Sequence, residues 1–447
     1  MPLDPRDVPF APRLTSVSTP VISARTAAFS AAGGLLLVVA AYVVPRWWYE
    51  DIDVEFPPLH ASWDPTFPPG AVAVIAIGIA LALVLPSLAA RLRWPALLLV
   101  AFSTLWLWIM ALAMTQGTDG LASTFERKQE YVYDAQHVTS ISTMLHEFID
   151  RIPLDSADNW HVHVAGHPPG ALLYFVGLDR LGITDPFWIG VVCVTIACTA
   201  VVAVMITFRT LGTEKLARST MPWIVLAPSA VWMGVNGDAV FTAVAAWGLA
   251  LLALAATRSS IPAAIAAGLL LGCCVYLSYG LVLLGILAVT VLLIARTWRP
   301  LPWALGGAAI VAVAFTAGGF AWWEAYPVLR QRYYDGIASD RHYSYWVWAN
   351  LGAWTCTVGL AVWAAFPAAR RRLRTNVLVQ LAGAAMLTIL VATLSGMSKG
   401  ETERIFLPFT IWVVALPALL PARWHRGLLL SQVALGLGAQ LLLLTRW

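Results

Sequence analysis

The sequence predicts an all-helical protein that crosses a membrane many times. Of its 447 residues, 60% are hydrophobic and only 12% are charged, and the mean hydropathy is +0.75. Apolar runs recur along almost the whole chain, which is more apolar surface than a water-soluble core can bury. The 22 tryptophans suit the membrane–water interfaces, where an indole ring is half in water.

The sequence has about 13 apolar runs that approach the length needed to cross a hydrocarbon core of about 30 Å. Several of them are short or interrupted by proline. They lie at about residues 28–45, 69–90, 95–115, 186–208, 220–234, 237–256, 261–280, 281–296, 302–322, 347–365, 376–395, 404–420 and 428–446.

These spans divide the chain into four stretches. Residues 1–27 are expected to form a cytoplasmic tail without a signal-peptide pattern, so the first span directs insertion. The other stretches are N-terminal spans over 28–115, a central module over 116–256 and C-terminal spans over 257–447. Long outer loops are expected over 116–185, 323–346 and 396–403.

The distribution of charge orients the spans. With a cytoplasmic tail, the tail and the inner loops hold 17 of the 28 Lys and Arg residues, as the positive-inside rule requires. The same orientation places 21 of the 24 acidic residues and seven of the eight histidines on the outer side or at its edge. Acid–base chemistry is therefore expected on the periplasmic or external face of a plasma membrane.

Several function classes do not fit this composition. The net charge of +4 comes from the arginine-rich inner loops and does not indicate nucleic-acid binding. No GxxxxGK[ST] or GxGxxG pattern lies between a strand and a helix. All five cysteines fall in apolar runs, without the spacing of a zinc or disulfide framework. An enzyme on the outer face would need its activated substrate delivered on a lipid.

The loop over 116–185 is expected to contain two helices at the membrane surface. From Thr124 to Ile152, apolar residues recur at helical spacing between charges, which predicts an amphipathic helix ended by Pro153. From Pro169 to Leu181 about 13 mostly apolar residues follow the "HPPG" motif, too few to cross a bilayer. Proline in the first turn costs a helix no hydrogen bond, so this motif is expected to start a helix.

The order of motifs in the central module resembles a known family. A span is followed by an acidic residue in "TQGTDG", by "EYVYDA", and then by "HPPG" with aromatic residues. The pattern continues through "FRTLG", "MPWIVLAPS" and "WMGVNGDAVFTAVAAWG". This spacing, over roughly 115–256, resembles the polyprenyl-phosphate-dependent glycosyltransferases of the GT-C fold. The first two spans are additional to the usual arrangement of that family.

The resemblance implies an acidic general base in the first outer loop. Asp119 is the matching position, and Glu130 and Asp134 are the alternatives. The acceptor hydroxyl of a sugar needs a proton acceptor as it attacks, and a positioned base contributes roughly 100- to 10,000-fold to the rate. The structural alternative for Asp119 is an exposed loop residue in an Asx turn.

The resemblance also gives roles to Asp238 and His167. Asp238, in "VNGDAV", would bind a substrate hydroxyl or a divalent ion, with a helix N-cap as the alternative. His167 would lie near the donor phosphate. The spacing of His161, His163 and His167 also permits a zinc reading, but the resemblance accounts only for the last, and we assign no metal ligand. Whether Asp119, Asp238 and His167 together hold a divalent cation stays open, and the sequence requires no cofactor.

Binding of a donor phosphate needs cations, which are few on the outer side. Residues 328–348 supply Arg330, Arg332, Arg341 and His342 among tyrosines, with anchoring at the interface as the alternative. Residues 395–406 supply Arg404, which is expected to be drawn into the protein to pair with an acid or to bind a phosphate bidentately. The complete set of substrate-binding candidates is His167, Glu130, Tyr131, Asp134, Arg341, His342, Lys399, Glu401 and Arg404.

The expected activity is inverting transfer of a sugar of the arabinofuranose or mannose class from a polyprenyl-phosphate donor to an envelope glycan or glycolipid. The partners would be that donor, the acceptor and membrane lipids. The Ala, Arg and Trp bias suits a high-GC bacterium of the actinobacterial type. Two other functions are a flippase or transporter of lipid-linked substrates and a non-catalytic GT-C-like scaffold. A transporter would carry ionisable residues in the middle of several spans and internal repeats, and the sequence has neither.

Overall fold

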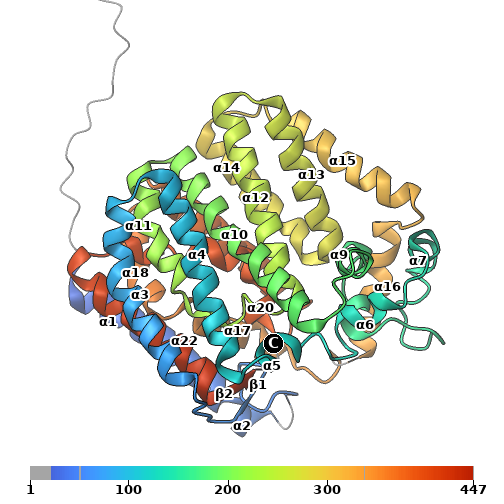
Figure 1. Cartoon of the computed structure of the whole chain (residues 1–447), viewed down its shortest axis with the longest axis horizontal. Helices are drawn as coiled ribbons and strands as arrows, with labels where there is room; N and C mark the ends of the chain where they lie inside the picture. The colour runs from blue at the N-terminus through green and yellow to red at the C-terminus, as the bar shows by residue number, and fades with distance from the viewer. Residues whose placement is uncertain (1–21, 50–51, 337, 446–447) are drawn as a thin grey trace, which may run out of the picture.

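Long apolar helices form the frame of the protein (Figure 1). The computed structural model describes residues 22–49, 52–336 and 338–445, so most of the expected tail over 1–27 lies outside the described residues. Within the described part, six helical segments are long and apolar enough to cross a membrane, and two bent pairs raise the number to eight. The helices of the six are α1 (Ala24–Val43), α3 (Ala71–Arg91), α4 (Trp94–Ala113), α10 (Pro186–Leu211), α12 (Gly237–Arg258) and α19 (Val377–Leu394).

The two bent pairs and several shorter helices complete this frame. The angle is 73° between α15 (Leu301–Ala317) and α16 (Trp322–Asp335), and 101° between α17 (Tyr343–Val358) and α18 (Leu360–Arg370). The other helices are α11 (Glu214–Val225), α13 (Ile261–Leu277), α14 (Leu284–Ala295), α21 (Leu407–Val413) and α22 (Ala422–Leu442). The protein is therefore an all-helical membrane protein, whereas the count of about 13 spans and the GT-C arrangement stay predictions.

Two expected spans are broken by proline. The span expected over 220–234 ends as a helix at Val225, because Ala227 precedes Pro228 and adopts the extended backbone that proline imposes on its neighbour. The span expected over 404–420 divides into the four-residue helix α20 (Thr402–Ile405), α21 and a 3-10 turn. Pro408 stands in the first turn of α21, where its missing N–H costs nothing.

The long outer segment folds into short helices. The single amphipathic helix expected over 124–152 is wrong: the structure has α6 (Tyr131–Gln136) and α7 (Ile141–Glu147), because the Ser140 side chain caps a new helix start. The helix expected after "HPPG" is confirmed as α9 (Pro169–Arg180). Two four-residue helices, α5 (Asp119–Ala122) and α8 (Val162–Ala165), complete the segment.

Helices α6, α7, α9 and α16 gather at one end of the molecule (Figure 1). Arg332 on α16 donates to the carbonyl oxygens of Ile152 and Trp160, which ties the expected loop over 323–346 to the first outer segment. Gly170 lets α9 approach α13, since a Cβ atom there would lie 2.4 Å from the Tyr276 carbonyl oxygen. The glycine of "HPPG" therefore serves close packing of the helices.

Two short strands join the N-terminal and C-terminal stretches of the described chain. Strand β1 (Ala61–Trp63) pairs antiparallel with β2 (Leu443–Thr445), which directly follows α22. The four-residue helix α2 (Pro45–Trp48) precedes β1, and α1 packs against α17 and α18. The N-terminal and C-terminal stretches therefore form one body with the central module.

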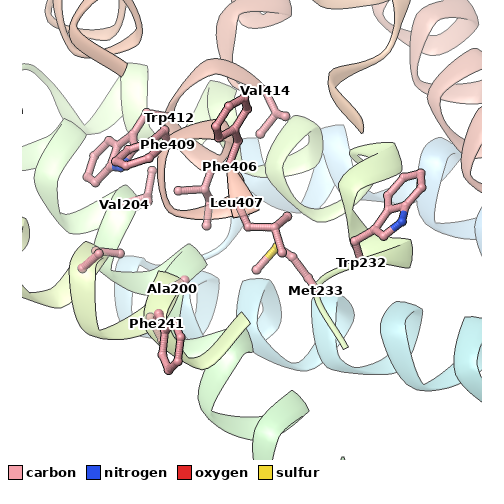
Figure 2. Close-up of a cluster of buried hydrophobic side chains, with 14 of the residues drawn as sticks. Ala200, Val204, Trp232, Met233, Phe241, Phe406, Leu407, Phe409, Trp412 and Val414 are labelled. Carbon is pink, nitrogen blue, oxygen red and sulfur yellow. The ribbon is translucent and has the colours of Figure 1, made fainter. Parts of the chain in front are cut away.

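The core lies between α10, α12 and the segment of α20 and α21 (Figure 2). Phe406, Leu407 and Trp412 are buried there, and Figure 2 shows them in one cluster with Val204 of α10 and Phe241 of α12. Because fully burying such a side chain contributes about 1.5–3 kcal/mol, this cluster fixes the position of the residues that come just before Phe406.

Small residues hold α13 against α15. A Cβ atom on Gly268 would lie 1.9 Å from the Ala304 carbonyl oxygen of α15, and one on Gly272 would lie 2.9 Å from the Ala308 Cα atom. Such small-residue contacts let the backbones of membrane helices approach closely, where van der Waals packing replaces the hydrophobic effect.

We expect Gly268→Ala to destabilise the protein by about 1–3 kcal/mol, because the added methyl group forces α13 and α15 apart. Gly285→Ala on α14 is the matched control: no atom lies within 4 Å of its Cβ position, and alanine in a helix is favoured over glycine by about 0.5–1 kcal/mol. Thermal unfolding midpoints in detergent measure both. Equal effects of the two substitutions would contradict the close contact.

Candidate functional site

A cavity of about 330 Å³ opens where α8, α16 and the loop before α20 meet. Cavities of this size hold small ligands or headgroups. Its apolar lining includes Leu154, Val162, Leu329, Met397 and Ile405. Its polar lining consists of His163, His167, Arg332, Tyr333, Arg341, Ser398, Lys399, Glu401 and Arg404. Five of the expected substrate-binding residues therefore line one cavity: His167, Arg341, Lys399, Glu401 and Arg404.

Arg404 is buried and pairs with two carboxylates. Its Nη1 atom contacts Oδ2 of Asp238, in the first turn of α12, and its Nη2 atom lies 2.8 Å from Oε2 of Glu401. The expectation that Arg404 is drawn into the protein to pair with an acid agrees with this geometry. The pair joins α20 to α12, which are far apart in the sequence.

Arg341 forms a second ion cluster beside the first. Its Nη2 atom lies 3.0 Å from Oδ2 of Asp53, and its Nη1 atom lies 3.5 Å from Oε1 of Glu401. Nη1 also donates to the Lys399 carbonyl oxygen at 2.6 Å. Glu401 therefore bridges the two buried arginines, Arg341 and Arg404.

The loop over 396–403 has a fixed shape. Asn350 on α17 donates to the Ser398 carbonyl oxygen and accepts from the Gly400 amide. Glu401 has a φ of 58°, a left-handed conformation that costs a non-glycine residue about 1–3 kcal/mol. The ion pairs of the Glu401 carboxylate with Arg341 and Arg404 offset that cost.

Two cations of the cavity contact no carboxylate in the described chain. The Nζ atom of Lys399 donates to the Ala338 carbonyl oxygen at 2.8 Å, and Arg332 donates to the carbonyl oxygens of Ile152 and Trp160 and to Asn159. Burial, together with repulsion by Arg341, lowers the pKa of Lys399. A lysine has three donors, so an anion in the cavity would find two of them on Lys399.

His163 and Glu130 form a dyad at the wall of the cavity. The Nδ1 atom of His163 lies 2.9 Å from Oε1 of Glu130, which is buried at the start of α6. On the opposite side of the imidazole ring, Nε2 lies 3.5 Å from Nη2 of Arg404. A carboxylate at Nδ1 favours the tautomer with its proton on Nδ1 and leaves Nε2 able to accept a proton.

His167 and Tyr131 lie behind this dyad. The Nδ1 atom of His167 lies 2.8 Å from the His163 carbonyl oxygen, and burial lowers the pKa of His167 to about 4. The Tyr131 ring stacks on Phe175 of α9 with ring centroids 5.0 Å apart. His167 is therefore a neutral hydrogen-bonding group at pH 7.

The carboxyl groups around the cavity differ in charge state. Burial would raise the pKa of Glu401, but Arg404 and Arg341 outweigh it and hold the pKa at about 2. Burial likewise opposes ionisation of Glu130, and His163 outweighs it and lowers the pKa. At Glu403, burial dominates and raises the pKa to about 7, although its Oε1 atom accepts from the His60 amide.

Three expected site residues lie apart from the cavity. Asp119 is exposed at the first residue of α5 and is not part of the cavity lining. Asp134 is buried and accepts from the ring of His161 at 2.9 Å. His342 is exposed, and its ring packs against Tyr49. Within the described residues, no hydrogen bond or ion pair joins the Asp119 side chain to Asp238 or to the start of α9.

Sequence reasoning gave no site role to two residues that contact the site, His163 and Asp53, and it named Arg332 only as one cation of the segment over 328–348. The chain turns into α8 after His161 and directs His163 to Glu130. Arg332 is separated from its acceptors by more than 170 positions. The apolar residues on both sides of His163, Val162 and Val164, were the available signal.

The histidine motif does not gather into a metal site. His161 pairs with Asp134 and His163 with Glu130. Within the described ranges, no group of three or more His, Cys, Asp or Glu residues has a metal-binding arrangement. Asp119, Asp238 and His167 accordingly do not form such a group.

We expect Glu403 to make stability depend on pH. The folded protein holds a proton on Glu403 up to a pH of about 7, whereas the unfolded chain releases it near pH 4.3. Its contribution to stability is therefore present below pH 4.3 and is lost as the pH rises to about 7. Glu403→Gln should remove this loss.

The measurement is the change in unfolding midpoint between pH 5 and pH 8 in detergent for both proteins, and the variant should lose less stability over this interval. The same fall in midpoint for both proteins would show that Glu403 does not titrate there.

Comparison with known proteins gives no assignment. No known protein family matches this chain, and no curated protein is significantly similar to it.

Proposed function

We propose that this protein is a membrane glycosyltransferase that takes a sugar from a polyprenyl-phosphate donor and transfers it to a glycan or glycolipid on the outer face of the membrane. One observation carries the proposal: an apolar-walled cavity holds the cations Lys399 and Arg332, which contact no carboxylate in the described residues, beside the His163–Glu130 dyad. Cations, an apolar wall and a proton acceptor are what transfer from a lipid phosphate requires.

The donor would bind through its phosphate. Lys399 and Arg332 would contact the phosphate oxygens, and Leu329, Met397 and Ile405 would contact the first isoprene units. Charge-assisted hydrogen bonds to phosphate are about twice as strong as neutral ones. A lipid-linked donor also fits the absence of a nucleotide-binding motif from the sequence.

The transfer would be a direct displacement. The acceptor oxygen bonds to the anomeric carbon, the bond from that carbon to the phosphate oxygen breaks, and polyprenyl phosphate leaves with the electron pair. The acceptor hydroxyl would replace Arg404 as the donor to Nε2 of His163, whose present contact with Nη2 of Arg404 is long at 3.5 Å. The acceptor proton then passes to Nε2, and Glu130 stabilises the resulting imidazolium. Lys399 and Arg332 stabilise the charge that develops on the leaving phosphate.

In this proposal the role expected for Asp119 passes to the His163–Glu130 dyad. Asp119 is exposed and does not line the cavity, whereas a general base must come within hydrogen-bond reach of the proton it takes. Asp238 keeps an indirect role, because its carboxylate holds Arg404 beside His163. The sugar class, arabinofuranose or mannose, stays a proposal that follows from the resemblance.

The function is tested with purified protein in detergent, labelled polyprenyl-phosphate pentose or hexose donors and a glycan acceptor. The measurement is the release of polyprenyl phosphate. We expect Lys399→Met to lower kcat/KM by about tenfold to 100-fold, because a hydrogen bond to a charged group contributes about 1.5–3 kcal/mol. Lys128→Met removes an exposed lysine of the outer segment and is the matched control. Equal activity of both variants would exclude Lys399 from phosphate binding.

The base assignment is tested by single-turnover rates with saturating donor. We expect His163→Ala and Glu130→Gln to lower the rate by roughly 100- to 10,000-fold, the usual contribution of a positioned base. Asp119→Asn should leave the rate unchanged. The opposite pattern, with loss only in Asp119→Asn, would return the role of base to Asp119 and refute the dyad.

A further inference from the structure

A second and larger cavity lies at the other end of the helices. Its volume is about 690 Å³, and it lies between α3, α11 and the start of α22. Helix α10, whose 26 residues extend about 39 Å, runs from the α9 end to the α11 end of the molecule. Figure 1 shows the connection between α3 and α4, at this cavity, on the side of the molecule away from α5 and β1.

Two positively charged loops converge on this cavity. The start of α11, directly after its connection from α10, supplies Lys215 and Arg218, and the start of α22 supplies Arg426. Both belong to loops that the positive-inside rule places on the cytoplasmic side. The cavity is therefore in the inner leaflet if the chain has the orientation expected from its charges.

The charged residues of this cavity differ in the partners they contact. Arg218 donates to the carbonyl oxygens of Ala89 and Leu92 at the end of α3 and pairs with Glu214. Glu214 also pairs with Arg209. Lys215 and Arg426 are exposed and contact no carboxylate within the described part of the chain. Two cations are therefore available to a ligand, and the single acid of the lining is already neutralised.

One wall of the cavity is apolar along the axis of α3. Ala82, Leu83 and Pro86 of α3 and Leu429 of α22 line it, and Leu83 is 43% exposed. From Leu83 to Ala90 this surface of α3 extends about 10 Å. An apolar wall of that depth, ending in cations, matches an acyl chain that ends in an anionic headgroup.

We propose that this cavity binds an anionic phospholipid, with the lipid phosphate at Lys215 and Arg426 and the start of an acyl chain along α3. The opening to the side at Leu83 favours a molecule that already lies in the membrane over a soluble phosphate. Basic pockets between membrane helices on the cytoplasmic side recognise lipid headgroups by this chemistry. The bound lipid would hold α22, which leads directly into β2, against α3 and α11.

This site is independent of the glycosyltransferase proposal, because it shares no lining residue with the cavity at Lys399. The test is the shift in unfolding midpoint of the detergent-purified full chain on titration with phosphatidylglycerol, with phosphatidylcholine as the zwitterionic comparison. We expect phosphatidylglycerol alone to stabilise the protein. The double variant Lys215→Ala/Arg426→Ala should bind it about 30-fold more weakly, since each of the two cations near a lipid surface contributes about 1 kcal/mol and about 1.4 kcal/mol is a tenfold change in affinity.

The matched control is Arg371→Ala/Arg374→Ala, which removes two exposed arginines between α18 and α19, outside the cavity. It should keep the affinity of the unmodified chain. Equal weakening in both double variants would show a diffuse charge effect and overturn the proposal. Equal stabilisation by phosphatidylcholine would also overturn it.

Two further titrations separate the possible sources of phosphate. Inorganic phosphate alone should give no shift, and a shift equal to that of phosphatidylglycerol would replace the lipid by a soluble anion and refute the proposal. Polyprenyl phosphate should compete only weakly for this site. Stronger binding of polyprenyl phosphate than of phosphatidylglycerol, lost in Lys215→Ala/Arg426→Ala, would assign the cavity to the carrier and overturn the phospholipid assignment.

Discussion

The buried charge of Arg404 is the constraint on which the site depends. A guanidinium in an apolar interior costs several kcal/mol of desolvation, and only well-placed acids and hydrogen bonds offset that cost. Burial alone would lower the pKa of Arg404, but Asp238 and Glu401 raise it above its ordinary value. The start of α12 and the loop over 396–403 must therefore lie where these two carboxylates meet Arg404, and the shape of the cavity follows from that.

The apolar core beneath Arg404 makes this arrangement rigid. Phe406, Leu407 and Trp412 are buried between α10 and α12, directly after the short helix α20 (Figure 2). The ion pairs alone would allow a flexible arginine side chain to follow its partners. Because the backbone at residue 406 is fixed by packing, the guanidinium position is fixed as well, and His163 is held at a constant distance from it.

The long spans were predictable and the contacts of the site were not. The spans at 69–90, 95–115, 186–208 and 237–256 agree with helices of the structure to within a few residues, because apolar runs of that length have no other stable form in a membrane. The errors at 124–152, 220–234 and 404–420 lie where a capping serine or a proline competes with apolar periodicity. The burial of Arg404 followed from its apolar flank. Its partner Asp238 is 166 positions away, and no local pattern indicates such a pair.

The charges of the cavity divide into two groups with different consequences. Arg341 and Arg404 are saturated by Asp53, Glu401 and Asp238, so their charge is already neutralised within the protein. In the described part of the chain, Lys399 and Arg332 donate to carbonyl and amide oxygens, and Lys399 also lies over the Tyr334 ring. These partners satisfy hydrogen bonds but do not neutralise charge. A buried cation of that kind is stabilised by any anion that enters, and its field is strongest where water is excluded. The saturated pair therefore fixes the geometry, and the unsaturated pair would supply the attraction for the phosphate of the proposed donor.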